Sequence, residues 1–309
     1  MKLSYFGYTL GDSAGQNQYL FDIRNFLKSF MKYADASFRS RFVHADEHIY
    51  LLPFRDNLFL FIMTRENEVI KKIRSSDLSV SQLREFLKEG ETLGFTSYVY
   101  FDECFLAFAS TLMAPKAKVF ANFMNDLFDA VKITDYRFVL HPFMQQTTEE
   151  EVMAFPFIGR SSIVVNKYSN IFHEVMKFFS IDDPDLVDID SFEFVIRPKR
   201  QKNIQRAMKN IVKRAGQEGI EKFILRAKEE IDGHVMDLYL VGQGQISDDL
   251  SGVDEERISQ KIQELIKSNS ILREKIRDHK YNGRFTKNEI EDFARFDSAD
   301  AWNPPPAGV

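Results

Sequence analysis

Lysine and arginine side chains gather in one stretch of this sequence, between Arg197 and Lys228. The stretch holds eleven Lys or Arg against two Glu, a local balance of +9 in a chain whose formal net charge is −5. Ammonium and guanidinium groups concentrated in this way are suited to the phosphates of a polyanion. A solvated charged surface without a ligand is the alternative interpretation, and the sequence leaves it open.

The first half of the stretch has the period of an amphipathic helix, which we expect over Gln201–Ala215. Pro198 suits the approach to its start and Gly216 suits its end. At 100° per residue the apolar residues face one way, and the basic residues fall within an arc of about 60° on the other side. The apolar residues are Ile204, Met208, Ile211 and Ala215. The basic residues of this arc are Lys202, Arg206, Lys209 and Lys213.

The second half alternates as a strand over Glu221–Lys228, with Phe223, Leu225 and Ala227 on one side. Asp232-Gly233 predicts a hairpin turn, after which His234–Val241 returns as the next strand. We therefore expect a basic helix face and a basic strand face to form one cationic surface. The basic residues of the strand are Lys222, Arg226 and Lys228.

Other residue patterns indicate weaker candidates for chemistry. The sequence His44-Ala45-Asp46-Glu47-His48 fits the inverted zinc-protease pattern H-x-x-E-H, but its flanks favour strands where that chemistry needs a helix. An acidic cluster could hold Mg²⁺ as a nuclease does, which keeps a metal-dependent nuclease as an alternative function. The cluster comprises Asp185, Asp188, Asp190 and Glu193.

Arg160 follows Gly159 in the middle of a strand predicted over Phe155–Lys167. A β-bulge there would either present the arginine to a ligand or serve the backbone alone. The single cysteine, Cys104, excludes a disulfide framework and a multi-cysteine zinc site, and the phosphate-binding loop GxxxxGK[ST] is absent. We expect no cofactor, no bound metal and no enzymatic activity.

The elements that position these residues predict an α+β fold of mostly antiparallel sheets with packed helices and two sub-domains. We expect an N-terminal α+β domain over residues 1–145, a basic α+β domain over 146–252, a helical segment over 253–295 and a flexible tail over 296–309. One long helix is expected over Asp254–His279, with an apolar stripe that serves either core packing or self-association. The chain lacks an 18-residue apolar run and begins without a secretory signal pattern, so we expect a cytoplasmic protein.

Several stretches resemble the RexA family of phage-exclusion proteins from lambdoid phages, in the same order along the chain. They are ETLGFTSYVYFDECFLAFASTLMAP, EVMAFPFIGRSSIVVNK, DSFEFVIRPKRQKNIQRAMKNIV and ILRAKEEIDG, and the resemblance spans Leu58–Asp249. It implies a cytoplasmic, homodimeric protein that binds double-stranded DNA without sequence specificity and senses infection in an abortive-infection pair. Its partner would be a RexB-like membrane channel protein, through which it is recruited to the inner membrane.

The resemblance also places the DNA-contacting basic pair of the family on Arg226 and Lys228. The KwaB component of the Kiwa antiphage system, which works with a KwaA-like membrane protein, is a related alternative. The sequence HADEH and the Pro-rich C-terminus have no counterpart in this resemblance.

The sequence thus predicts an antiphage DNA-binding protein that contacts duplex phosphates. A protein–protein adaptor whose basic surface meets an acidic partner is a third alternative. The candidate DNA-binding residues, strongest first, are Arg226, Lys228, Lys222, Lys202, Arg206, Lys209, Lys213, Lys199, Arg200 and Arg160.

Overall fold

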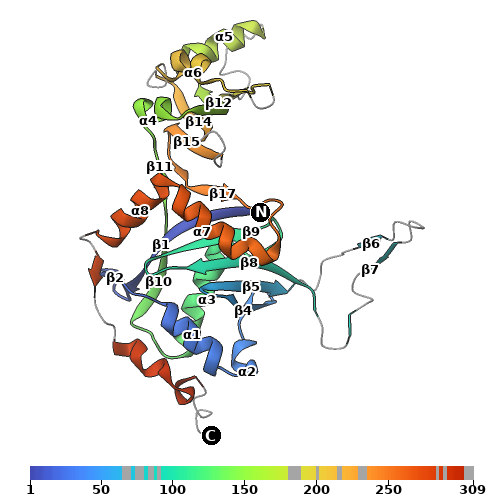
Figure 1. Ribbon diagram of the computed structural model, residues 1–309, viewed down its shortest axis with the longest axis vertical. Helices are drawn as coiled ribbons and strands as arrows, with labels where there is room; N and C mark the ends of the chain where they lie inside the picture. The colour runs from blue at the N-terminus through green and yellow to red at the C-terminus, as the bar shows by residue number, and fades with distance from the viewer. Residues whose placement is uncertain are drawn as a thin grey trace. The chain divides into compact units, whose positions relative to one another are not determined.

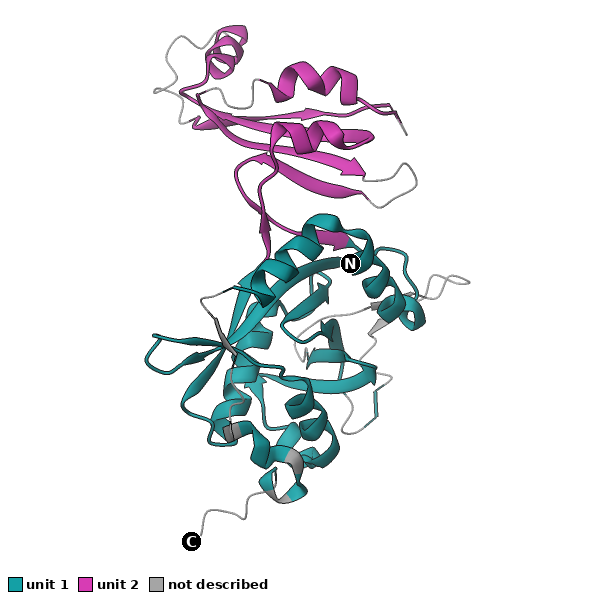
Figure 2. Ribbon diagram, turned by 60° about the vertical axis from the view of Figure 1, so that its left-hand side comes forward, with its two compact units in different colours: residues 1–142, 249–309 teal, residues 143–248 magenta. Residues whose placement is uncertain are grey.

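The computed structural model describes residues 1–64, 71–73, 80–82, 87–88, 92–179, 189–199, 202–213, 218–228, 235–282, 285–287 and 291–302. The chain forms two compact units (Figure 2): unit 1 comprises Met1–Pro142 and Asp249–Val309, and unit 2 comprises Phe143–Asp248. Unit 2 is therefore an insertion in the sequence of unit 1. The mixed α+β class with antiparallel sheets is confirmed.

A large sheet organises unit 1 around strand β1 (Lys2–Asp12), which pairs antiparallel with its neighbours on both sides. The described strands follow the order β18-β2-β1-β9-β8-β5-β4-β3, and β10 also pairs with β1. Strands β18 and β2 run parallel. The other strands of unit 1 are β2 (Gln18–Leu20), β3 (Val43–His44), β4 (Glu47–Arg55), β5 (Leu58–Thr64), β8 (Gly94–Phe101), β9 (Phe105–Ser110), β10 (Tyr136–Pro142) and β18 (Phe285–Lys287), with a separate pair β6 (Lys71–Ile73) and β7 (Val80–Gln82).

One face of this sheet carries a core rich in phenylalanine. Alternation along β1 sends Tyr8 and Leu10 into this core, where they meet the apolar sides of the helices. The helical elements on this face are α1 (Arg24–Tyr33), α2 (Ala36–Arg39), α3 (Ala117–Ala130), η4 (Glu291–Asp297) and η5 (Ala299–Ala301). Trp302 follows η5 and is fully buried, and its indole N–H lies 3.1 Å from Ser29 Oγ and 3.0 Å from the carbonyl of Phe296.

The sequence predicted a flexible tail from residue 296, and this prediction is wrong as far as Trp302. Phe296 and Trp302 fill the aromatic core against Phe26, so the hydrophobic gain holds this segment on unit 1. The segment predicted to stand alone over 253–295 likewise belongs to unit 1.

The opposite face of the sheet carries η3 (Glu255–Arg257), α7 (Ile258–Ser268) and α8 (Ser270–Lys280), and Figure 1 shows α7 and α8 in front of the strands with α3 behind them. The predicted single helix breaks at Asn269, whose extended backbone (ψ 103°) cannot continue α7. Its side-chain oxygen accepts from the backbone N–H of Leu272 at 2.9 Å and so caps α8. Buried Ile258, Ile262 and Leu265 assign the apolar stripe to core packing.

Unit 2 is built on a four-stranded antiparallel sheet in the order β13-β12-β14-β15. The elements in chain order are β11 (Met144–Gln145), α4 (Glu149–Ala154), β12 (Phe157–Asn166), α5 (Asn170–Phe178), β13 (Ser191–Ile196), α6 (Gln205–Val212), β14 (Ile220–Lys228), β15 (Met236–Val241) and β16 (Gly244–Gln245). Strand β17 (Ser247–Asp249) follows at the boundary between the units in the sequence and is part of the large sheet, where it pairs with β1. No helix in the described part of the chain is long and apolar enough to cross a membrane.

Candidate nucleic-acid interface

Strand β14 has the two faces that its sequence predicts. Phe223, Leu225 and Ala227 are fully buried, whereas Lys222 and Arg226 are exposed. The same two faces continue across the neighbouring strands, because residues that pair directly lie on the same face of the sheet. We call the side that carries Phe223 the helix face and the side that carries Arg226 the open face.

Helices cover the helix face. Phe194 of β13 and Phe223 both pair with Ile163 of β12, so they share this side of the sheet. The ring of Phe172 in α5 contacts that of Phe192 at 4.8 Å, and helix α6 also packs on β12. Met208 and Val212 are the buried residues of α6. The cations of α6 must therefore point away from the sheet, on the side opposite to Arg226.

A β-bulge brings Arg160 beside Arg226. Ile158 pairs with Ala227 and Ser161 pairs with Leu225, so two residues of β12 stand opposite Arg226 alone. Gly159 fits here because a Cβ at this position would lie 3.2 Å from the ring of Phe157 and 3.5 Å from the carbonyl of Arg226. The predicted bulge is therefore confirmed. Arg160 is exposed on it, as contact with a ligand would require.

The chain after β13 brings further cations to the same end of the sheet. Ile196 pairs with Ser161, so Arg197 follows beside Arg160. A turn in which Lys202 N–H donates to the carbonyl of Lys199 (2.9 Å) leads to Asn203. The Asn203 side chain accepts from the N–H of Ile158 at 3.1 Å and donates to the carbonyl of Pro156 at 2.7 Å. These bonds fix the segment along the start of β12.

Six basic residues therefore converge where β12 begins and β13 and β14 end, and we call them the basic end. They are Arg160, Arg197, Lys199, Lys202, Arg226 and Lys228. Arg206, in the first turn of α6, is exposed and points away from the sheet like the other cations of that helix. Sequence reasoning did not single out Arg197, although the strand predicted to end at Ile196 places it there.

The structure does not bring the remaining candidates to this end. Lys222 pairs with Val164, near the other end of the sheet, and Lys209 and Lys213 lie in the last turn and at the C-cap of α6. The expected single cationic surface from helix and strand is thus not what the fold forms. Helix α6 also begins later than predicted, because Asn203 and Ile204 are hydrogen-bonded to the start of β12. Arg200 lies outside the described residues.

The open face changes in charge from one end to the other. Asp237 of β15 pairs with Arg226, and its Oδ1 lies 3.2 Å from Nε of Arg226. Lys228 Nζ lies 5.5 Å from the ring centroid of Phe157. At the other end Glu193 pairs with Val164 and accepts a hydrogen bond from Ser162, and Glu221 accepts one from Asn166 at 2.9 Å. Lys222, which also pairs with Val164, offsets part of this negative charge. An anionic ligand would accordingly meet the stronger attraction at the basic end.

The other sequence patterns form no comparable site. The HADEH residues lie on the β3–β4 hairpin, with positive φ at Ala45 and Asp46. Glu47 accepts from the Thr64 hydroxyl at 2.8 Å, and the His48 ring contacts the carbonyl of Ser40. In the acidic cluster, Asp185 and Asp188 lie outside the described residues, and Asp190 and Glu193 are exposed. Within the described ranges no three His, Cys, Asp or Glu residues are grouped to hold a metal ion.

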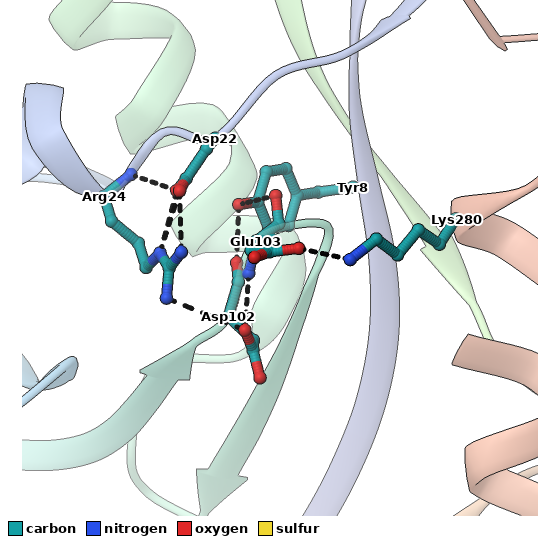
Figure 3. A network of polar contacts seen from close by, with 6 residues as sticks. All are labelled: Tyr8, Asp22, Arg24, Asp102, Glu103 and Lys280. Carbon is teal, nitrogen blue, oxygen red and sulfur yellow. Dashed lines mark hydrogen bonds and ion pairs between the residues drawn. The ribbon is translucent and has the colours of Figure 1, made fainter. Parts of the chain in front are cut away.

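A polar network in unit 1 ties the β8–β9 turn to α1 and α8 (Figure 3), and its members are Tyr8, Asp22, Arg24, Asp102, Glu103 and Lys280. The Tyr8 hydroxyl donates to the carbonyls of Asp102 and Glu103 at 2.7 and 2.9 Å, and burial raises the pKa of Tyr8. Arg24 forms an ion pair with Asp22 at 2.7 Å, and the hydrogen bond from Arg24 to Asp22 raises the pKa of Arg24. The network fixes the turn and stabilises unit 1.

The sequence has relatives among known proteins. Residues 1–235 match the model of the family described as "RexA: Intracellular sensor of Lambda phage, Abi component". The chain is 26% identical over 215 residues to Protein rexA of Escherichia phage lambda, a match that covers 70% of this chain and 76% of that protein. Protein rexA of Enterobacteria phage 434 gives the same identity and coverage. A family match over this much of the sequence shows that the chain belongs to the RexA family, whose place is in phage exclusion and antiviral defence.

Proposed function

We propose that this protein senses phage infection by binding double-stranded DNA at the basic end of unit 2. The observation that carries the proposal is the convergence of Arg160, Arg197, Arg226 and Lys228 with the turn that holds Lys199 and Lys202. Lysine and arginine side chains at such a surface displace counterions from the DNA backbone, so binding weakens steeply with salt. If about six cations engage phosphates, the log–log slope of affinity against salt is near −5.

The contacts would be made without reading the base sequence. Backbone contacts position a protein on the duplex but carry no sequence information. The exposed cations extend from strands and from a turn, and the open face is formed by strands. Two duplexes of unrelated sequence and equal length should therefore bind with equal affinity and equal salt slope.

The test compares the DNA affinity of two double variants. One lacks two positive charges at the basic end, and the other lacks two positive charges elsewhere in unit 2. Arg226→Ala combined with Lys228→Ala should weaken duplex binding and reduce the salt slope by about two units. Lys209→Ala combined with Lys213→Ala removes the same charge from the outer side of α6 and should change the slope by less than one unit. Fluorescence anisotropy with a labelled duplex over a salt series measures both pairs.

Two results would contradict this assignment. Unchanged affinity in the Arg226→Ala/Lys228→Ala variant would remove the basic end from consideration. Equal losses in the two double variants would mean that overall charge, and not this site, attracts DNA.

We further propose that the protein acts as a cytoplasmic homodimer and by binding, not by cleaving DNA. Supercoiled plasmid incubated with the protein and Mg²⁺ or Mn²⁺ should remain intact. Nicking or linearisation that is lost in Asp190→Ala would favour the nuclease alternative instead.

In this proposal a membrane protein, RexB-like or KwaA-like, receives the signal and recruits the sensor to the inner membrane. Support comes from the family resemblance alone. Host cells that express both proteins should exclude phage, and the Arg226→Ala/Lys228→Ala variant should restore plating. Full exclusion by the sensor without any partner would contradict the proposed pair.

A further inference from the structure

Among the described elements of unit 2, β13 lies at the edge of the sheet, and the described helices cover it only in part. Phe192, Phe194 and Ile196 point to the helix face, yet each remains half-buried, unlike Ile163 and Phe223 in the strands beside them. Helix α5 packs on β12, one strand further in. The apolar side of the edge strand is therefore left partly open.

A groove of about 900 Å³ runs between α5 and β13. Its lining is mostly apolar and also includes three polar residues. The apolar residues are Ile171, Val175, Phe178, Phe179, Phe192 and Phe194, and the polar ones are Asn170, Glu174 and Glu193. Phe178 and Phe179 are 82% and 59% exposed, although large apolar side chains are normally covered. An edge strand beside an open apolar groove is the arrangement that accepts an added β-strand.

We propose that β13 of a second copy of this chain fills the groove, pairing antiparallel with β13 about a two-fold axis at Val195. This names the interface of the homodimer that the proposed function includes. The strand is complementary to itself in this register: Glu193 faces Arg197 of the second copy, Phe194 faces Ile196, and Val195 faces Val195. Each opposite-charge or apolar cross-strand pair contributes roughly 0.2–1 kcal/mol relative to alanine, and the two-fold axis makes every pair except the central one twice.

The exposed surface in the groove fits this occupant. If each ring offers about 200 Å², Phe178 and Phe179 leave roughly 280 Å² uncovered per copy. That is about a third of the ~800 Å² that each partner buries in a standard interface. The pairing strands and the remaining groove residues would supply more. To occupy the same place, another extended peptide would need apolar residues at every second position and an arginine opposite Glu193. Strand β13 and Arg197 directly after it already provide both.

The dimer would join the two four-stranded sheets into one continuous sheet, so that the two open faces lie side by side. Across the shared edge, the β14 strands of the two copies would be five strand spacings apart, about 24 Å. The antiparallel arrangement places one basic end at each end of the joined sheet. A single duplex could then be held at two places, which raises avidity without a new contact.

Cysteine cross-linking tests the pairing independently of DNA binding. Val195→Cys should form an intermolecular disulfide under mild oxidation, because antiparallel partners have Cα atoms about 4.5–5.5 Å apart, which a disulfide can span. The expected result is a non-reducing band at twice the 36.1 kDa of the chain. The native Cys104 is buried, so the unmodified protein should give no such band.

Ser191→Cys is the matched control, since it is exposed on the same strand but its two copies would be about 26 Å apart. It should not cross-link. Phe178→Ser combined with Phe179→Ser should abolish the Val195→Cys cross-link and shift the protein to a monomer in analytical ultracentrifugation.

Three outcomes overturn the proposal: no cross-link at Val195→Cys, equal cross-linking at Ser191→Cys, or a cross-link that persists without both phenylalanines. A protein that stays dimeric while Val195→Cys fails to cross-link would place the interface elsewhere and leave the DNA-binding proposal standing. Conversely, if Arg226→Ala/Lys228→Ala abolishes DNA binding but leaves the Val195→Cys cross-link intact, the dimer interface and the DNA-binding site are independent of each other.

Discussion

Arg226 is the strongest single candidate for phosphate binding, and it already has an anionic neighbour. Its Nε lies 3.2 Å from Oδ1 of Asp237, and the two side chains are 53% and 37% exposed. Exposed ion pairs of this kind are worth about 0.2–1 kcal/mol. A phosphate can therefore compete for the guanidinium at modest cost, and Asp237 sets how large that cost is.

Asp237→Asn should tighten duplex binding by about 1.5- to 5-fold, because it removes this competition. Glu221→Gln makes the same charge change near the other end of β14, outside the proposed dimer interface, and should have a smaller effect. Anisotropy titrations at one fixed salt concentration compare the two variants. Weaker binding by Asp237→Asn would show that Asp237 positions Arg226 for phosphate and does not compete with it.

At the scale of elements, α8 attaches to the sheet through a buried histidine. The His279 ring occupies the space where a Cβ of Gly7 would lie, and its Nε2 is 3.2 Å from the carbonyl of Tyr8. The His141 ring lies 5.8 Å from it and contacts the Thr9 hydroxyl at 2.8 Å. Burial lowers the pKa of both histidines below their ordinary value of 6.5.

Unit 1 should therefore lose stability as the pH falls below about 6.5. In that range the unfolded chain binds protons at these histidines and the folded chain does not, so protons favour unfolding. His141→Gln should reduce the loss between about pH 7.5 and pH 5.5, whereas His173→Gln, on the surface of α5, should not. Urea midpoints at the two pH values measure the effect, and an undiminished loss in His141→Gln would contradict it.

The periods of the sequence predicted the sides of the elements well. Alternation over β14 identified Phe223, Leu225 and Ala227 as buried, and the helical period identified Met208 as facing inward. The prediction that the basic sides of the helix and the strand form one cationic surface is wrong for a physical reason. In a two-layer unit, apolar sides that pack against each other force the basic sides of strand and helix outward in opposite directions. The basic end depends instead on a bulge and on Asn203, which are tertiary features that no period encodes.

At the scale of the whole molecule, unit 1 is assembled from both ends of the chain. The elements expected from the sequence suggested four consecutive segments, but residues after 249 return to the sheet that begins at Lys2. The returning segment contains apolar residues at irregular spacing, namely Phe293, Phe296 and Trp302, and irregular spacing has no periodic signal.

Trp302→Ala should lower the unfolding free energy of unit 1 by about 3–5 kcal/mol, since it leaves a large cavity in the aromatic core. Trp302→Phe keeps most of the apolar volume but loses the two contacts of the indole N–H, so it should cost less. Urea unfolding followed by circular dichroism compares them. Duplex affinity at low temperature should stay unchanged in both, and equal stability of wild type and Trp302→Ala would refute the packing role.

The insertion of unit 2 also sets the order in which the chain can fold as it is made. Unit 2 ends at Asp248, whereas the core around Phe26 and Phe30 is closed only when Trp302 has been synthesised. At 5–20 residues per second, the residues between Pro142 and Trp302 take roughly 8–32 s to leave the ribosome. During that interval the phenylalanines of α1 and α3 have been synthesised, but the segment that carries Trp302 does not yet cover them. Exposed apolar side chains of this kind are prone to aggregate. We therefore expect the first half of the chain to depend on chaperones during synthesis more than unit 2 does.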